Sequence, residues 1–217
     1  MNLLWKIEKY SITDIYEVLR QANIIDAVAE DMVERTLLTK DGDLDIFTIL
    51  HEAGKRLAVM SIKQISAPEH GEAFNDLLAL LRPQVEVKHI IQTINDHAKY
   101  EPLEENPDIV KRTELGTVSK IEYLLNDQLF SFNARPIGRW LDMAAVHQHA
   151  NAFLERIDHP QRLYAMDVDW GEYSPYFSAD WETFPKVQKM LRIPITDDLE
   201  KQRQAGLEKV AQMLRTK

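Results

Sequence analysis

Apolar side chains recur at helical spacing along much of the chain. The stretch after Ser11 begins with a capping-box pattern, Ser-Ile-Thr-Asp, and continues with apolar residues on one face of a helix. These residues are Ile12, Ile15, Tyr16, Leu19 and Ala22. Similar stripes predict helices over 73–81, just before Pro83, and over 87–98. Asn23 and Asp43 are further candidates for the start of a helix.

Helix-start signals continue in the second half of the chain. Asn106, Pro107 and Asp108 supply an N-cap, a proline at the first helical position and an acid in the first turn. Thr117 predicts the cap of a short helix over 117–125. Asn133 predicts the start of a long helix that reaches about 157, and an Asp-x-x-Glu pattern from 197 predicts the last helix.

Glycine is scarce, with 7 residues in 217, about half the usual share. Sandwiches and barrels need many turns with glycine at positive φ, so this scarcity favours helices. The sequence therefore predicts a mainly α fold of roughly eight or nine helices, arranged as a multi-helix bundle or a short α-solenoid-like array. The alternative is an α+β fold with a hairpin at 46–65, because 57–65 is rich in apolar and β-branched residues.

The chain is expected to form a single compact domain over 1–217. Segments 31–38 and 108–115 are identical at five of eight positions, which is also the level of match that chance produces. If the match reflects an internal duplication, the repeated halves are 11–83 and 84–163. The acidic, aromatic segment and the helix over 164–217 then follow as a C-terminal part.

Composition and charge exclude several classes of protein. The formal net charge of −9 argues against a protein that binds nucleic-acid phosphates, because that affinity comes from Lys and Arg. Because the chain has no cysteine, thiolate metal sites, iron–sulfur clusters and cysteine nucleophiles are excluded. Neither the apolar core of a secretory signal nor a membrane-spanning stretch occurs. We expect a cytoplasmic protein with no membrane association and no cofactor.

The stretch 164–184 has the most unusual composition. Its 21 residues contain five acids, no Lys or Arg, and seven of the chain's 18 aromatic residues. Three interpretations compete. The aromatic side chains could fill a core while the acids face water, or the segment could be a protein-binding surface with aromatic anchors. The third is a Mg²⁺ or Ca²⁺ site at Asp167, Asp169 and Glu172.

The sequence predicts a non-enzymatic protein that binds another protein, as an acidic inhibitor, an immunity-type protein or an adaptor does. The expected partner has a basic surface, because carboxylates steer such a partner and buried aromatic residues then hold it. Self-association is left open. The candidate binding residues are Asp167, Asp169, Trp170, Glu172, Tyr173, Tyr176, Asp180, Trp181 and Glu182.

The alternative function is a metal-dependent hydrolase or nuclease that uses the Asp/Glu cluster, with a contribution from His147. Catalysis is the less favoured of the two functions, because no nucleophile elbow, phosphate-binding loop or zincin helix occurs in the sequence. His147 and His149 resemble a metal pair, but on a helix their rings lie about 200° apart around the axis. Two such rings cannot bind one ion together.

Overall fold

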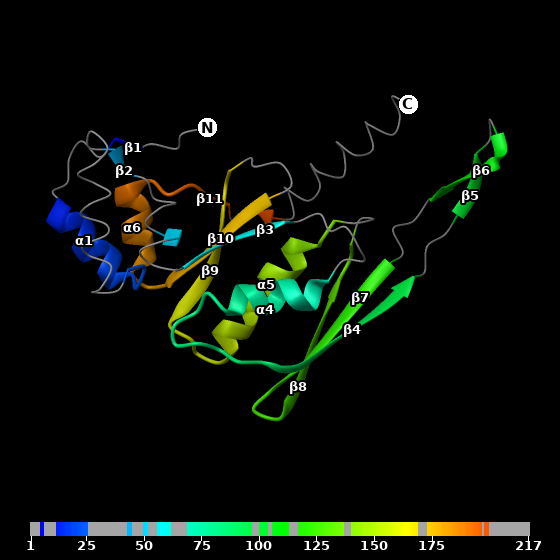
Figure 1. Ribbon diagram of the computed structural model, residues 1–217, viewed down its shortest axis with the longest axis horizontal. Coiled ribbons are helices and arrows are strands. Elements are labelled where there is room, and N and C mark those ends of the chain that lie inside the picture. The colour runs from blue at the N-terminus through cyan, green and yellow to red at the C-terminus, as the bar shows by residue number, and fades with distance from the viewer. Residues whose placement is uncertain are drawn as a thin grey trace. The chain divides into compact units, whose positions relative to one another are not determined.

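The computed structural model shows a mixed fold with more strand than helix, in antiparallel sheets (Figure 1). The predicted all-helical bundle or solenoid is therefore wrong. The chain divides into two compact units: unit 1 comprises 1–60, 76–85 and 151–197, and unit 2 comprises 61–75, 86–150 and 198–217. The structure describes residues 5–6, 12–25, 43–44, 50–51, 56–61, 69–96, 100–103, 106–112, 117–136, 140–168, 173–196 and 198–199.

Unit 1 is built on a four-stranded sheet in the order β11-β9-β10-β3. Apolar side chains of α1, β10 and α6 form one core. Each of these elements contributes a fully buried residue to it: Leu19, Phe177 and Val187 respectively. A short β1–β2 pair also belongs to this unit. Its elements are β1 (Trp5–Lys6), α1 (Ile12–Gln21), β2 (Asp43–Leu44), β3 (Leu57–Ser61), β9 (Gln161–Met166), β10 (Tyr173–Asp180), α6 (Phe184–Leu191) and β11 (Ile195–Thr196).

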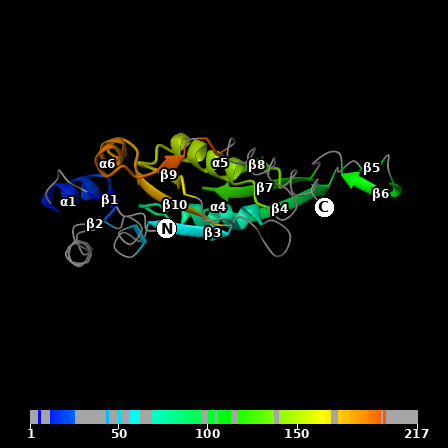
Figure 2. The same cartoon turned by 90° about the horizontal axis from the view of Figure 1, so that it is seen from above.

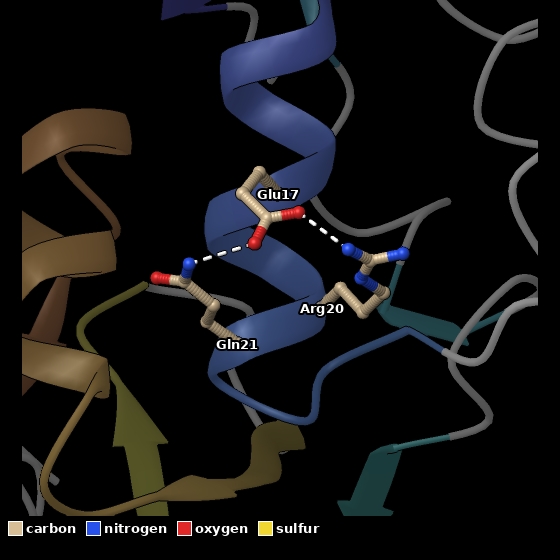
Figure 3. Close-up of polar contacts among 3 residues, drawn as sticks. All are labelled: Glu17, Arg20 and Gln21. Atoms are coloured by element: carbon tan, nitrogen blue, oxygen red, sulfur yellow. Dashed lines mark hydrogen bonds and ion pairs between the residues drawn. The ribbon is translucent and has the colours of Figure 1, made fainter.

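The first predicted helix is confirmed, as α1. Its apolar stripe is buried at Ile15, Val18 and Leu19. On the exposed side, the Glu17 carboxylate accepts hydrogen bonds from Arg20 Nη2 at 2.6 Å and from Gln21 Nε2 at 2.8 Å (Figure 3). Residues three and four positions apart lie on one helix face, so one carboxylate reaches both neighbours.

Unit 2 contains a three-stranded antiparallel sheet in the order β4-β7-β8 (Figures 1 and 2). The turn between β7 and β8 is Asn126–Asp127, both at positive φ, which is the two-residue hairpin geometry that suits strand twist. A separate β5–β6 ladder is inserted between β4 and β7. The strands are β4 (Lys88–Asp96), β5 (Tyr100–Leu103), β6 (Asn106–Arg112), β7 (Thr117–Leu125) and β8 (Gln128–Ala134).

Helices α4 (His70–Leu78) and α5 (Met143–Arg156) each contribute residues to both units. The first turn of α4 packs on the sheet of unit 2. The Gly71 backbone N–H donates to Gln92 Oε1 at 3.1 Å, and a Cβ added at Gly71 would lie only 2.8 Å from Ile90 Cγ2. A helix is thus confirmed where 73–81 was predicted, but α4 begins and ends three residues earlier, at His70 and Leu78.

This close approach makes Gly71→Ala a test of the packing. Alanine normally favours a helix over glycine, but here the methyl group meets a β-branched side chain with a stiff χ1 angle. We expect Gly71→Ala to lower the free energy of unfolding by about 1–2 kcal/mol, measured by chemical denaturation. In an Ile90→Ala background the same change should be neutral or stabilising. An equal loss in both backgrounds would contradict this contact.

Several predicted helices are strands, which corrects the fold class. Segment 87–98 contains β4, 117–125 is β7, and Asn133 lies in β8, so the long helix α5 begins only at Met143. Asn106-Pro107-Asp108 begins β6 rather than a helix. In β7 the alternation decides, because Ser119, Ile121 and Tyr123 are buried while the residues between them are half-buried. Among the described strands β6 pairs with β5 alone, and proline is tolerated in such an edge strand.

The alternative prediction, a hairpin at 46–65, falls largely outside the described residues, but 57–61 within it is a strand, β3. β3 pairs with β10, from a distant part of the sequence. The predicted helices after Asn23 and Asp43, the last helix from 197 and segment 31–38 lie largely outside the described residues, so the internal duplication stays a prediction. Among the described residues, no helix has the length and apolar character needed to cross a membrane.

Candidate functional site

Six of the nine candidate binding residues are described, and they lie in different environments of unit 1. Asp167 and Tyr173 are exposed, Tyr173 at 52%, and Tyr176 is buried inside the sheet. Trp181 is 48% exposed and lies just beyond the end of β10. At about 3.3 Å per residue, roughly 25 Å of strand separate the two exposed aromatic side chains. The remaining candidates are Asp180, half-buried; Glu182, exposed; and Asp169, Trp170 and Glu172, which lie outside the described residues.

Most of the described aromatic residues in this segment form core. Phe177 lies with its ring centroid 5.4 Å from that of Tyr164 and 5.3 Å from that of Phe184. Burial raises the pKa of the Tyr176 hydroxyl well above its usual value, and a hydrogen bond with Ser174 opposes that shift. Trp181 and Tyr173 are therefore the two described aromatic residues that present a large apolar surface to water here.

A hydrogen-bonded turn fixes the backbone around Trp181. Asp180 Oδ1 accepts from the backbone N–H groups of Glu182 at 3.1 Å and Thr183 at 3.2 Å, the pattern of an Asx turn. The Trp181 N–H donates to the carbonyl oxygen of Pro160 at 3.2 Å. Because the residues on both sides of Trp181 are held, its indole projects from a rigid support.

The same turn is tied to the end of α1. The Asp180 N–H donates to the carbonyl oxygen of Ala22 at 3.0 Å. The Thr183 hydroxyl lies 3.0 Å from the carbonyl oxygen of Gln21 and 3.2 Å from Asp180 Oδ1. The contact of Thr183 with Gln21 places this loop beside the last turn of α1. Figure 3 shows the side chains on that part of the helix, of which Arg20 and Gln21 are exposed and Glu17 is half-buried.

Arg162 supplies the cation beside the indole. Its Cζ atom lies 5.8 Å from the centroid of the Trp181 ring, within the range of a cation–π interaction. Its Nη1 donates to the carbonyl oxygens of His159 at 2.6 Å and Gln161 at 2.9 Å, which fixes the guanidinium. We call Arg162, Trp181, Glu182 and the last turn of α1 the Trp181 site.

Sequence reasoning missed Arg162 and Gln21 as members of this site. Arg162 reaches Trp181 through the pairing of β9 with β10, which sets Ala179 opposite Arg162 and Asp180 opposite Gln161. Gln21 joins through a contact with a residue 162 positions away. No local pattern marks either residue, because both contacts depend on tertiary structure.

A buried polar network lies behind the site and positions the start of β9. Gln161 Oε1 accepts from Arg56 Nη1 at 3.1 Å and from the Arg82 backbone N–H at 2.5 Å. Arg56 Nη2 donates to Asn23 Oδ1 at 2.9 Å. His159 Nδ1 accepts from the Gln161 N–H at 3.1 Å, which leaves its Nε2–H to donate to the Pro83 carbonyl oxygen at 3.0 Å.

Unit 2 holds a second cluster with a titratable group, formed by Tyr123 and His149. His149 Nε2 lies 2.8 Å from the Tyr123 hydroxyl, and the imidazole stacks on Phe132 with ring centroids 4.3 Å apart. Burial lowers the pKa of His149 to about 4. A neutral imidazole accepts the Tyr123 O–H, but because Tyr123 is fully buried, its hydroxyl cannot meet a substrate in this arrangement.

This cluster should make the stability of the protein depend on pH. The unfolded His149 binds a proton near pH 6.5 and the folded one only near pH 4, so the free energy of unfolding falls as pH decreases between these values. After allowance for partial solvent screening, we expect a loss of about 1–2 kcal/mol between pH 7 and pH 4.5. Chemical denaturation of the protein and of His149→Phe tests this. Equal pH dependence in both would contradict it.

The described residues offer no group of three or more His, Asp or Glu side chains that could bind a metal ion together. Two of the three carboxylates of the candidate metal site, Asp169 and Glu172, lie outside the described part of the chain. His147 and His149 both lie on α5, where their spacing separates the rings. The metal-dependent hydrolase thus stays a prediction from sequence.

Comparisons with known proteins add no family to this description. No protein-family model matches the chain, and neither a curated protein sequence nor a solved structure matches it. The function proposed below therefore rests on the chain's own residues and their geometry.

Proposed function

We propose that the protein binds another protein through the Trp181 site, as an acidic inhibitor, an immunity-type protein or an adaptor does. The observation that supports this most directly is a half-exposed tryptophan on a turn whose backbone is hydrogen-bonded on both sides. The indole exposes apolar surface to water, and the free energy of binding becomes more favourable when a partner covers that surface.

The physical advantage of this arrangement is that little conformational entropy is lost on binding. A partner that covers the indole gains apolar burial, worth about 1.5–3 kcal/mol for a large side chain. Fixing a mobile loop would offset much of that gain, but here the Asp180 turn is already formed. Tryptophan and arginine together are the residues most enriched among the energetically dominant positions of interfaces.

Charge favours a basic partner. The chain carries a formal net charge of −9, and Glu182 is exposed beside Trp181. Long-range attraction of this kind accelerates encounter with a positively charged surface, and salt weakens it. The Arg162 guanidinium is fixed beside the indole by hydrogen bonds to two carbonyl oxygens, so it adds a positive charge of defined position that contributes to specificity.

Affinity capture from native lysate with tagged variants tests the proposal. We expect a protein that is retained by the unmodified chain and by Ile91→Ala, and lost by Trp181→Ala. Ile91 is the matched control because it is 59% exposed and belongs to unit 2. Thermal unfolding of each variant shows whether it is folded. A folded Trp181→Ala protein that captures the same partner in the same amount would contradict the proposal.

A further inference from the structure

Strand β8 is an edge of the unit 2 sheet without the devices that usually protect an edge. In the described part of the chain it pairs with β7 alone. Its sequence, Gln-Leu-Phe-Ser-Phe-Asn-Ala, contains no charge, proline or glycine, and its register with β7 is continuous from Gln128 to Ala134. Native proteins normally blunt such an edge with charges, prolines or bulges.

The opposite edge strand, β4, has the irregularities and charges that β8 lacks. Its register with β7 shifts between Lys88 and Ile91, and His89 has a positive φ of 52°. A bulge of this kind twists an edge and ends regular pairing. Lys88 and Asp96 also place a charge at each end of the strand. β8 is therefore the edge that is regular enough to accept another strand.

Hairpin geometry identifies the backbone groups that β8 presents. The two residues that flank a two-residue turn form a hydrogen-bonded pair, here Leu125 with Gln128. Along the rest of the ladder, hydrogen-bonded pairs alternate with pairs that do not bond to each other. Residues 128, 130, 132 and 134 consequently bond to β7. The N–H and C=O groups that face outward belong to Leu129, Ser131 and Asn133.

We propose that β8 pairs antiparallel with β8 of a second copy of this chain, around a two-fold axis at Ser131. Phe130-Ser131-Phe132 reads the same in both directions, so this axis sets each Phe130 opposite the partner's Phe132. Aromatic cross-strand pairs stabilise antiparallel ladders. The same axis makes Ser131 face the partner's Ser131 and Leu129 face the partner's Asn133, which are all outward-facing residues. About six hydrogen bonds form, and the two sheets become one.

Charge opposes a second copy elsewhere on the surface but permits one at β8. Two chains of net charge −9 repel each other over most of their surfaces. The seven residues of β8 bring no charge to the contact, and the exposed side chains of Leu129, Ser131 and Asn133 are neutral. Because one seven-residue ladder buries less than the ~1,600 Å² of a standard interface, we expect a dimer with a Kd in the micromolar range.

Single-cysteine cross-linking tests the axis directly, because the chain has no cysteine of its own. Ser131→Cys places two thiols in directly paired residues, about 5.5 Å apart between α-carbons. Asn133→Cys is the matched control, since it is equally exposed but lies about 13 Å from its own copy. Under mild oxidation at micromolar concentration, we expect Ser131→Cys to form a covalent dimer at least ten times faster than Asn133→Cys. Equal rates would overturn the proposed register.

Sedimentation velocity over a concentration series tests the dimer itself. Ser131→Pro removes an outward N–H group and leaves the ladder with β7 intact, so it should stay folded and monomeric. Ile94→Pro makes the corresponding change on the β4 edge and should still dimerise. A monomer at all concentrations for the unmodified chain, or a dimer that Ile94→Pro abolishes and Ser131→Pro does not, would overturn the proposal. Trp181→Ala should dimerise normally, which separates this test from that of the Trp181 site.

Discussion

Replacing Gln161 by leucine is expected to lower the free energy of unfolding by about 3–5 kcal/mol. Gln161 is fully buried, and its Oε1 accepts from the Arg56 guanidinium and from the Arg82 backbone N–H. Leucine has a similar volume but no acceptor, so the buried Arg56 guanidinium and the part-buried Arg82 N–H both lose a hydrogen bond. The cost of such a loss inside a protein is the desolvation of the groups left behind.

Gln161→Glu is the matched control for this network. The carboxylate keeps the acceptor toward Arg56, and the amide nitrogen that it replaces makes no hydrogen bond among the described residues. We expect Gln161→Glu to lose less than half as much stability as Gln161→Leu, with guanidinium chloride unfolding as the measurement. Two variants of equal stability would show that the acceptor does not hold this part of unit 1.

Phe177→Ala should cost about 3–5 kcal/mol of unfolding free energy. The ring is fully buried between Tyr164 and Phe184 and belongs to the core that α1, β10 and α6 share. Truncation removes the apolar burial and leaves a cavity that the surrounding strands and helices fill only in part.

Tyr173→Ala on the same strand provides the comparison, because that side chain is half-exposed. We expect it to change the unfolding free energy by about 0.5 kcal/mol or less. Urea unfolding of both variants measures the difference. If Phe177→Ala were as stable as Tyr173→Ala, the described core would not be the one that stabilises unit 1.

The sequence predicts best the helices that bury a single apolar stripe along one side. α1 and α4 each bury one stripe, and local spacing is enough to find them. The pattern around β4 predicts a helix because Ile90, Ile91 and Ile94 also fit helical spacing, and only pairing with β7 shows that they belong to a strand. Strand pairing is a long-range property, so no local signal distinguishes the two.

For the candidate site, the sequence predicted the segment but not the exposed residue within it. Composition pointed to the stretch that contains Trp181, because acids and aromatic residues gather there. It could not separate Trp181 from Phe177, because the sheet buries the middle of β10 continuously, Phe177 included, while Trp181 lies just beyond the end of that strand. Arg162 and Gln21 enter the site through contacts across the sheet and to α1, and these exist only once unit 1 has folded.

The most direct test of the central claim is the dissociation constant of the captured partner, measured by titration calorimetry with purified proteins. We predict that Trp181→Ala weakens binding at least about 30-fold, as expected for a dominant interface residue, and that Ile91→Ala changes it less than about three-fold. The thermal unfolding midpoint of Trp181→Ala should stay close to that of the unmodified chain. Unchanged affinity in a folded Trp181→Ala protein would contradict the assignment of this site as the binding surface.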